Sequence, residues 1–392
     1  MTKKIHLTRI ARVSTVPLFI FTLLRTQVEA IRDSGAAVTV ITSPDEDPKS
    51  FKPIENCDFK AVPIAREISL FADVVSLIRL IKLFRAERFD IVHSNTPKAG
   101  LLCAIAGKLA GIPIRIHTFT GQTWATIGGV KRLILKFCDK LIGHLNTSCY
   151  ADSPSQRDFL INSKIIKENK ISILGSGSLA GVDITRFNQE NFTDIEKTTI
   201  RESLNISKDQ LVLLFVGRVT KEKGIFELID AFAELLKCHI DIILLVVGPF
   251  EQNIEQEIKI YSNEKCGDKV IFSGFSVEPE KFIAIADILC LPSYREGFGT
   301  VVIEAAAMGV PTVGTKIYGL TDAVVDKQTG LLVEPRNIKD LTIALNQLIE
   351  DPQLRLKLGQ NAKMRALNEF DSRKFDTFVI SEYEKLLAGN HH

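Results

Sequence analysis

Short apolar runs alternate with longer segments of helical periodicity along the whole chain. The runs in the first half lie at residues 4–10, 37–42, 89–94, 112–119 and 140–148. A second series follows at residues 211–217, 241–248, 269–274, 287–293, 311–315 and 330–335. This alternation is typical of βαβ units and predicts parallel sheets with helices on their faces. The pattern therefore predicts an α/β protein.

A polar stretch at about 186–209 separates the two series and is the natural linker. We predict a first domain over residues 1–190, a second over 191–370, and a C-terminal helix over 371–390 that packs back on the first domain. Two open α/β domains joined by a hinge leave a cleft at the carboxyl ends of their strands, where ligands usually bind.

Composition excludes several classes of protein. The 392 residues are 45% hydrophobic and 24% charged, as in an ordinary globular protein. The early apolar stretch 16–24 is about half a bilayer span and is interpreted as a first helix, not a signal peptide. Seven scattered cysteines without CxxC spacing favour a reducing, cytoplasmic location and no zinc. No basic run has interleaved aromatics, so nucleic-acid binding is unsupported.

Charge is divided unevenly between the two halves. Residues 1–190 hold 26 Lys and Arg against 17 Asp and Glu, whereas residues 191–392 hold 23 against 30. The first half is therefore basic and the second acidic, which predicts different partners for each.

The segment 294–313 places one carboxylate in an apolar helix. From Val301 to Met308 every residue is apolar except Glu304. Thr300 is the expected N-cap, and Gly309 is expected to end the helix in the left-handed conformation. A buried carboxylate needs donors, which come either from an Arg or Lys of another element or from a ligand. Glycines before the helix leave amide groups for such a ligand.

A second motif, residues 216–232, begins at the end of the first strand of the second series. A strand, a turn with two cations and a helix that opens near Gly224 are suited to gripping a phosphate. The alternative is a solvated charged turn, Lys221-Glu222-Lys223.

Together these motifs resemble a known family. EGFGTVVIE (296–304) is similar to the E-x7-E motif of retaining glycosyltransferase family 4, and 216–232 resembles that family's G-R-x4-K-G signature. The resemblance implies the GT-B fold of two Rossmann-like domains, the first binding the acceptor and the second the nucleotide-sugar. It also implies a role in bacterial surface-polysaccharide assembly.

The resemblance also implies roles for individual residues. Arg218 and Lys223 would hold the donor diphosphate, Glu296 and the following amides the donor sugar, and Glu304 the ribose hydroxyls. The nucleobase would lie near the loops after the second and third strands of the second series. The remaining donor-binding residues on this interpretation are Gly217, Gly248, Gly274, Phe275, Gly297, Phe298, Gly299 and Thr300.

The first half departs from the family pattern at two places. Where relatives present a catalytic His, this chain has Thr120, and the nearest His is His117, which is either catalytic or structural. Where relatives often have a Gly-Gly pair, this chain has Ser14 and Thr15. These two residues and Gln122 are predicted to line the acceptor side.

No cofactor or metal is expected, because the nucleotide-sugar is a substrate. The acidic stretch 44–48 offers a DxD pattern, but two prolines flank it and it lacks a strand–helix context. We interpret it as a solvated loop.

The helix-periodic segment 70–89 is both basic and apolar. Arg79, Lys82, Arg85 and Arg88 recur every three residues among aliphatic positions. Such a helix either rests on anionic lipid at the inner face of the membrane or covers a sheet with a charged outer face.

The sequence therefore predicts a metal-independent retaining glycosyltransferase. It would move a hexose or N-acetylhexosamine from a nucleotide-diphospho-sugar, UDP-sugar favoured, to a polyprenyl-linked glycan. A nucleotide-sugar epimerase of the same fold and a non-catalytic sugar-nucleotide binding protein are the alternatives.

Overall fold

The computed structural model describes residues 4–44, 52–65, 69–251 and 254–389. The chain forms two compact units, Met1–Gly181 with Ser372–His392 and Val182–Asp371. It crosses from one unit to the other at residues 181–182 and again at 371–372. The first crossing precedes the sequence-based boundary at 190.

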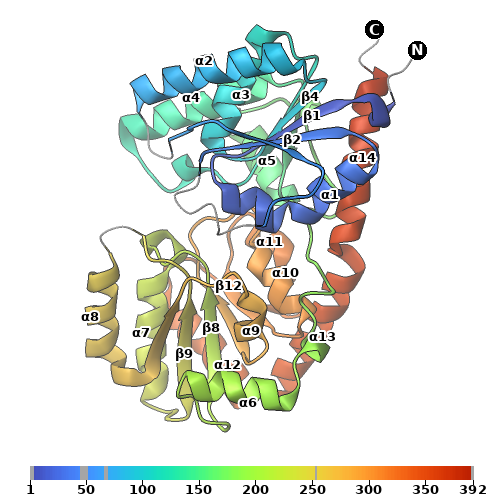
Figure 1. Cartoon of the computed structure of the whole chain (residues 1–392). Helices are drawn as coiled ribbons and strands as arrows, with labels where there is room; N and C mark the ends of the chain where they lie inside the picture. The colour runs from blue at the N-terminus through green and yellow to red at the C-terminus, as the bar shows by residue number, and fades with distance from the viewer. Residues whose placement is uncertain (1–3, 45–51, 66–68, 252–253, 390–392) are drawn as a thin grey trace. The chain divides into compact units, whose positions relative to one another are not determined.

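The first unit is built on a seven-stranded parallel sheet. Its strands lie in the order β3-β2-β1-β4-β5-β6-β7. Figure 1 shows β1 with its neighbours β2 and β4. Their bounds are β1 Arg9–Val13, β2 Ala37–Thr42, β3 Asp58–Ala61, β4 Ile91–Ser94, β5 Ile114–Phe119, β6 Ser148–Ala151 and β7 Ile171–Ile173. The order reverses between β1 and β4, and ligands bind beside such a reversal in open α/β sheets.

Helices cover both faces of this sheet. On one face α3 contacts both α2 and α4, and elsewhere in the unit the C-terminal helix α14 packs on α1. The helical bounds are η1 Ile5–Leu7, η2 Phe19–Leu23, α1 Arg25–Asp33, α2 Leu70–Glu87, α3 Pro97–Ala110, η4 Thr123–Ala125, α4 Gly129–Leu145, α5 Pro154–Asn162, η5 Glu168–Lys170 and α14 Ser372–Gly389. None of the described helices is both long and apolar enough to cross a bilayer.

The second unit contains a six-stranded parallel sheet in the order β10-β9-β8-β11-β12-β13. The strand bounds are β8 Leu211–Val216, β9 Ile242–Val247, β10 Val270–Gly274, β11 Ile288–Leu291, β12 Thr312–Thr315 and β13 Gly330–Val333. This is the doubly wound order of a Rossmann-like domain, with its reversal between β8 and β11. The prediction of an α/β protein with two parallel sheets is confirmed.

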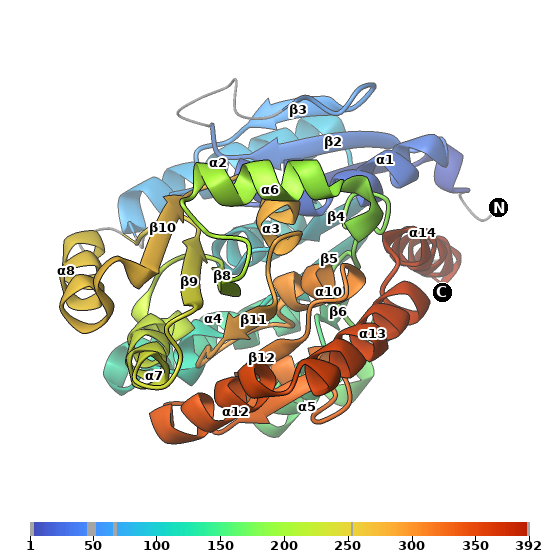
Figure 2. The ribbon, with the colours of Figure 1, turned by 90° about the horizontal axis from the view of Figure 1, so that it is seen from below.

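The helices of the second unit form two groups, because right-handed crossovers place them on opposite faces of the sheet. In one group α7 contacts α8 and α12, and in the other α10 contacts α9 and α13. Figure 2 shows α12 and α13 beside this sheet. The helical bounds are η6 Gln189–Asn191, α6 Asp194–Ser203, η7 Lys221–Lys223, α7 Ile225–Leu236, α8 Glu255–Cys266, η8 Gly267–Lys269, α9 Pro279–Ile283, α10 Thr300–Ala307, α11 Leu320–Ala323, α12 Ile338–Glu350 and α13 Pro352–Glu369.

Three sequence-based elements are placed differently in the structure. The apolar run 4–10 was predicted as a strand, but Ile5–Leu7 form η1 and β1 begins only at Arg9. The apolar run 140–148 was predicted as a strand, but α4 continues to Leu145 and the strand begins only at Ser148. The predicted linker contains α6, whose Thr193 and Glu196 form a reciprocal capping box. Apolar residues at the end of an amphipathic helix have the same composition as a short strand, so periodicity alone does not separate them.

A buried cation in β1 ties the C-terminal helix to the first sheet. Arg12 is fully buried and donates from Nη1 to the Tyr383 hydroxyl at 2.7 Å and from Nη2 to Gln27 Oε1 at 2.7 Å. Its Nη1 also lies 3.0 Å from His93 Nδ1. No described carboxylate forms an ion pair with Arg12 within 4 Å. Neutral oxygens and a ring nitrogen therefore replace the water that would otherwise solvate its charge.

Tyr383→Phe is therefore expected to destabilise the protein, because it leaves buried Arg12 with one acceptor fewer. We expect a loss of about 1–3 kcal/mol in the free energy of unfolding, measured by urea denaturation. Tyr261→Phe is the matched control, since its hydroxyl bonds Asp230 at a more exposed position, and it should cost less. Equal losses in the two variants would contradict a special role for the Arg12 network.

Candidate active site

The two sequence motifs of the second unit meet at one point of its sheet. Residues 217–224 follow β8 and residues 292–299 follow β11, and these strands are neighbours at the reversal of strand order. The carboxyl ends of parallel strands lie at one edge, so both loops emerge side by side. This edge is the candidate active site.

Ion pairs and hydrogen bonds join the two loops directly. Lys223 Nζ lies 2.5 Å from Glu296 Oε1, which also accepts a hydrogen bond from Ser293 Oγ at 2.8 Å. Next to this pair, Arg295 Nη2 lies 2.7 Å from Glu222 Oε2. The Tyr294 amide donates to the Glu222 carbonyl at 2.9 Å. The two adjacent ion pairs, Glu222–Arg295 and Lys223–Glu296, thus hold the turn after β8 against the loop after β11.

Close backbone approach makes one glycine of this junction necessary. Gly224 ends η7 and caps α7 with φ of +72°, and a Cβ there would lie 2.2 Å from the Pro292 carbonyl oxygen. Any side chain would therefore push the two loops apart.

The N-terminus of α10 offers amides to a ligand. Gly299, with φ of +89°, is the cap residue, and Thr300 is the first helical residue, so the prediction of Thr300 as the cap was wrong. Among the described residues, none accepts a hydrogen bond from the amides of Phe298, Gly299 or Thr300. The helix dipole adds to the attraction of these groups for negative charge.

Phe298 itself contributes only its backbone to this edge. Its side chain is 2% exposed and packs against Phe370, with the ring centroids 5.2 Å apart. Gly297 already makes an interaction of its own, and its carbonyl oxygen lies 2.6 Å from where a Cβ of Gly319 would be.

Glu304 has no direct partner in the described part of the chain. Its carboxylate lies one turn into α10, and no described residue donates a hydrogen bond to it or forms an ion pair with it. Burial raises its pKa to about 7, Arg186 opposes this shift, and Glu280 adds to it. Arg186 is itself paired with Glu280 at 2.7 Å. The alternative in which Glu304 forms a structural ion pair is therefore not seen.

Arg218 lies in the turn between β8 and η7. Its side chain is 45% exposed, and its Nη1 lies 3.9 Å from Glu251 Oε1 in the loop after β9. That pair is long and solvated, and such pairs contribute little energy.

Three glycines at the ends of β8, β9 and β10 pack the strand termini together. The Gly217 amide donates to Val247, and the Gly248 amide donates to Gly274. A Cβ on Gly248 would lie 1.9 Å from the Gly217 carbonyl oxygen. Phe275 directly follows the edge strand β10 and is 55% exposed.

In the first unit the predicted acceptor-side residues lie at the carboxyl ends of strands but are buried. Ser14 and Thr15 follow β1 and are 0% and 7% exposed. The Thr15 amide and hydroxyl both contact Thr96 Oγ1, at 2.9 and 2.8 Å. Gln122 is 1% exposed and accepts from Gln156 Nε2 at 3.3 Å.

His117 is held inside the first unit. It is 1% exposed, its Nδ1 lies 3.0 Å from Ser94 Oγ, and burial lowers its pKa to about 3. A Cβ on Gly100 of α3 would lie 2.4 Å from its ring, so the imidazole packs directly under that helix. This placement fits the structural alternative. Thr120 lies just beyond β5, half-buried, and donates to the Asn95 carbonyl at 3.2 Å.

Sequence reasoning missed three charged groups. Arg12 and Arg186 are described above. Asp152 follows β6, is 6% exposed and has no partner for its Oδ1, and burial raises its pKa to about 8. Arg12 is a charged residue among the apolar residues of β1, which is the same kind of pattern that drew attention to Glu304.

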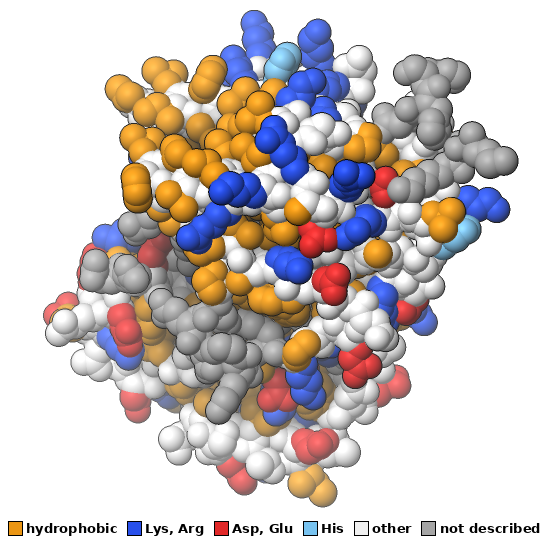
Figure 3. Space-filling model, turned by 45° about the horizontal axis from the view of Figure 1, so that its top comes forward, with side chains coloured by type: hydrophobic (Ala, Val, Ile, Leu, Met, Phe, Trp, Pro, Cys, Tyr) orange, Lys and Arg blue, Asp and Glu red, His pale blue; other side chains and the backbone are white. Residues whose placement is uncertain are grey.

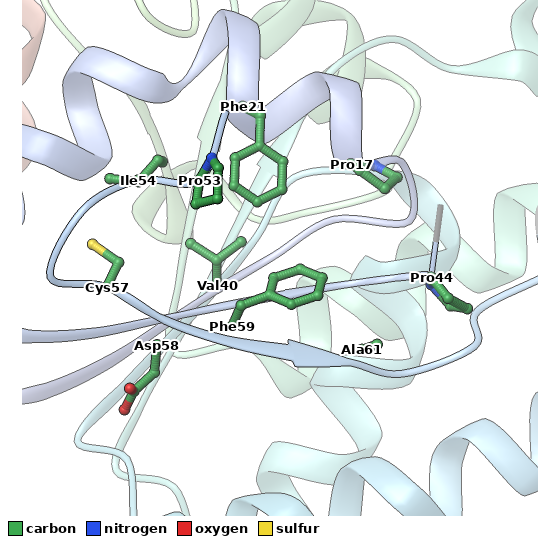
Figure 4. Close-up of a pocket in the computed structure, with 10 residues that line it drawn as sticks. All are labelled: Pro17, Phe21, Val40, Pro44, Pro53, Ile54, Cys57, Asp58, Phe59 and Ala61. Carbon is green, nitrogen blue, oxygen red and sulfur yellow. The ribbon is translucent and has the colours of Figure 1, made fainter. Parts of the chain in front are cut away.

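The first unit also contains an apolar cavity of about 340 Å³ (Figure 4). Phe21 and Phe59 face each other across it, with Val40 between them and Asp58 at its edge. With one acidic residue and no cation, its lining does not suit a phosphate. The acidic stretch 44–48 lies outside the described residues except for Pro44. The described residues contain no cluster of three potential metal ligands.

Comparison with known proteins identifies the family. Residues 196–365 match the model of glycosyl transferases group 1, and residues 22–177 match that of a glycosyl transferase 4-like domain. The chain is 34% identical to the capsular polysaccharide biosynthesis glycosyltransferase CapM of Staphylococcus aureus, over 93% of this chain and 94% of that one. The chain belongs to the group 1 glycosyltransferases. The resemblance inferred from the motifs is confirmed.

Other group 1 relatives and solved structures agree with this. An N,N'-diacetylbacillosaminyl-diphospho-undecaprenol alpha-1,3-N-acetylgalactosaminyltransferase of Campylobacter jejuni is 26% identical over 92% of this chain and 94% of its own. The structure of HepE from Anabaena with UDP and glucose has a TM-score of 0.81 at 19% identity, covering 96% of this chain and 100% of its own. Sucrose-phosphate synthase from Thermosynechococcus elongatus also gives 0.81, at 22% identity and 97% and 99% coverage. The GT-B fold is thereby confirmed.

The raised pKa of Glu304 makes stability depend on pH. The folded state binds this proton more tightly than the unfolded chain, whose carboxyl titrates near 4.5. Stability is therefore lost as pH rises from about 4.5 to about 7 and the carboxylate ionises. Glu304→Gln removes this loss, so the melting temperature of the ligand-free variant relative to wild type should rise between pH 5 and pH 8.

The control is Glu264→Gln, which alters an exposed carboxylate on α8. Its melting temperature should follow that of wild type at every pH. A Glu304→Gln difference that is flat across this range would contradict a desolvated carboxylate that lacks a partner among the described residues.

Proposed function

We propose that this glycosyltransferase is a retaining enzyme of cell-surface polysaccharide synthesis. Its donor would be a nucleotide-diphospho-hexose or N-acetylhexosamine, UDP-sugar favoured, and its acceptor a polyprenyl-linked glycan at the inner face of the membrane. The observation that carries the donor assignment is Glu304, a carboxylate for which the described residues provide no partner, beside helix amides that donate to no described residue. Vicinal hydroxyls of a ribose would supply the donors that the protein does not.

The two adjacent ion pairs support the proposal that a diphosphate and a sugar bind beside Glu304. Lys223 already binds Glu296, and Glu296 uses only Oε1 for its two described contacts. Its Oε2 is thus left for a sugar hydroxyl, while Lys223 retains donors for a phosphate oxygen because an ammonium has three. On this proposal one cation orients the carboxylate and binds the leaving group at the same time.

The chemistry is the departure of a diphosphate from the sugar. Negative charge on the diphosphate grows as the glycosidic bond breaks, so prealigned cations stabilise the transition state more than the ground state. Arg218 and Lys223 would supply this stabilisation without a metal. The acceptor oxygen then bonds to the anomeric carbon on the face that the diphosphate leaves.

A protein base is not required on this mechanism. His117 is buried under α3, and its pKa is lowered to about 3, so it is poorly placed to take a proton from an acceptor. We propose that the departing phosphate oxygen takes the acceptor proton. Thr120, at the end of β5, would position the acceptor instead of acting as a base.

The names of relatives support the kind of substrate. A relative from Escherichia coli, 25% identical over 79% of this chain, is a UDP-Gal:alpha-D-GlcNAc-diphosphoundecaprenol alpha-1,3-galactosyltransferase. The Campylobacter relative also acts on a diphospho-undecaprenol. The first unit, with Ser14, Thr15 and Gln122 at its strand ends, would bind the acceptor.

Incubation with labelled UDP-, GDP- and ADP-sugars tests the function against its alternatives. A thermal-shift screen first identifies the nucleotide that binds. Release of nucleoside diphosphate with transfer to a polyprenyl-diphosphate glycan supports the proposal, and the anomeric configuration of the product decides retention. A new sugar on the nucleotide without transfer would indicate an epimerase. Tight binding without even slow hydrolysis would indicate a binding protein.

Removing either proposed phosphate ligand should abolish most activity. Arg218→Ala and Lys223→Ala are each expected to lower kcat roughly a hundredfold or more, because losing such a donor costs about 2.7–4 kcal/mol in the transition state. Rates are measured as nucleoside diphosphate release at saturating donor.

Lys221→Ala is the matched control for both. Lys221 lies in the same turn, is 60% exposed and pairs with Glu257 at 3.0 Å. It should keep a near-normal kcat, and circular dichroism should show all three variants folded. Normal turnover in folded Arg218→Ala and Lys223→Ala proteins would refute the assignment of the diphosphate site.

A further inference from the structure

Helix α4 exposes an apolar stripe to solvent. Val130, Leu133, Ile134 and Phe137 are 72%, 66%, 53% and 64% exposed. Their spacing of three, one and three residues places them on one face of the helix. The buried residues of α4, among them Ile142, lie on the opposite face. A sheet-covering helix normally turns its polar face outward, so this stripe is an exception within an ordinary α/β domain.

Helix α2 exposes a second apolar group on the same side of the sheet. Phe71, Val74 and Ile78 are 84%, 54% and 47% exposed, whereas Leu80 and Phe84 point into the core. Both α2 and α4 contact α3, which lies between them. We call these seven exposed side chains the α2–α4 apolar face. Figure 3 shows hydrophobic side chains gathered on this part of the first unit, with Lys and Arg beside them.

The two helices that carry this face hold eight cations against three carboxylates. Arg79, Lys82, Arg85 and Arg88 belong to α2 and its C-cap, and Lys131, Arg132, Lys136 and Lys140 belong to α4. None of these eight cations forms an ion pair with a described residue. The carboxylates of the two helices are already engaged. Asp73 pairs with Lys98, Glu87 with Arg9, and Asp139 accepts from the Trp124 indole.

This combination selects the partner by its chemistry. Exposed aliphatic and aromatic side chains favour transfer into an apolar medium, and unpaired cations beside them require anionic groups at the edge of that medium. A bilayer with anionic headgroups provides both, since each Lys or Arg near such a surface strengthens binding about fivefold. A protein groove of mixed charge would leave most of the eight cations unmatched.

We propose that the α2–α4 apolar face docks the first unit on an anionic lipid surface. This goes beyond the basic helix noticed in the sequence, because α4 adds four exposed apolar side chains to those of α2. Only the biological role of this docking rests on the proposed function, because docking would hold the enzyme beside a polyprenyl-linked acceptor.

Vesicle sedimentation without any nucleotide-sugar tests the proposal. Vesicles of phosphatidylcholine with about one third phosphatidylglycerol should sediment the protein at low salt, and pure phosphatidylcholine should sediment far less. Leu133→Ser with Phe137→Ser should lower the partition coefficient at least tenfold. Lys131→Ala with Arg132→Ala should lower it mainly at low salt, because salt screens the charges.

The matched control is Ile260→Ser with Ile343→Ser, which removes two comparably exposed apolar side chains from the second unit. It should bind vesicles like wild type. Melting temperatures verify that all variants fold. Donor hydrolysis in the absence of vesicles should be unchanged in the α4 variants, which separates this inference from the donor site.

Three outcomes would overturn the proposal. One is no sedimentation of wild type with anionic vesicles. Another is equal loss of binding in the control and in the α4 variant. The third is a monomer–dimer equilibrium in analytical ultracentrifugation that the α4 substitutions abolish while vesicle binding persists, because the face would then be a contact between two copies of the chain.

Discussion

Lys223 and Glu296 join two loops that are 73 residues apart in the chain. Both side chains are mostly buried, at 20% and 11% exposure, so each would be poorly solvated without the other. Their ion pair, together with Arg295 and Glu222, fixes the turn after β8 against the loop that starts α10. The positions of the Arg218 turn, the α10 amides and Glu304 all follow from this junction, because each lies on one of the two loops or on the helix directly after it.

Glu304 shows how the candidate site departs from the rules that stabilise a core. A carboxylate in an apolar helix would ordinarily be paired, but Arg186, whose charge opposes the rise in the pKa of Glu304, is bound to Glu280 instead. The protein thereby keeps an acceptor unmatched at the carboxyl edge of its sheet. In the free protein, burial of the Glu304 carboxylate has an energetic cost that appears as its raised pKa. A ligand that donates hydrogen bonds to the carboxylate would offset this cost.

The second unit could be predicted closely from the sequence because its local signals agree with one another. Strands β8, β9 and β11 are continuous apolar runs, and glycines mark the ends of β8, β9 and β10. The first unit was harder. The end of α4 has the composition of a strand, and β3 and β7 are too short or too exposed for periodicity to detect.

The candidate site residues could likewise be predicted better in the second unit than in the first. The cations and carboxylates of the second unit stand in spaced motifs, so sequence alone paired them with the correct loops. Arg186 and Glu280 could not be found, because their influence on Glu304 depends on the path of the chain after residue 182. The burial of His117 depends on the absence of a side chain at Gly100, seventeen residues earlier, which no local pattern reveals.

The central claim is that Glu304 accepts hydrogen bonds from the ribose of the donor. Calorimetry should compare the tightest-binding nucleoside diphosphate of UDP, GDP and ADP with its 2′,3′-dideoxy analogue, for wild type and for Glu304→Gln. The account predicts that wild type prefers the ribose form by roughly tenfold or more, as expected for hydrogen bonds to a charged group, and that the variant loses most of this preference. An equal preference in both proteins would contradict it.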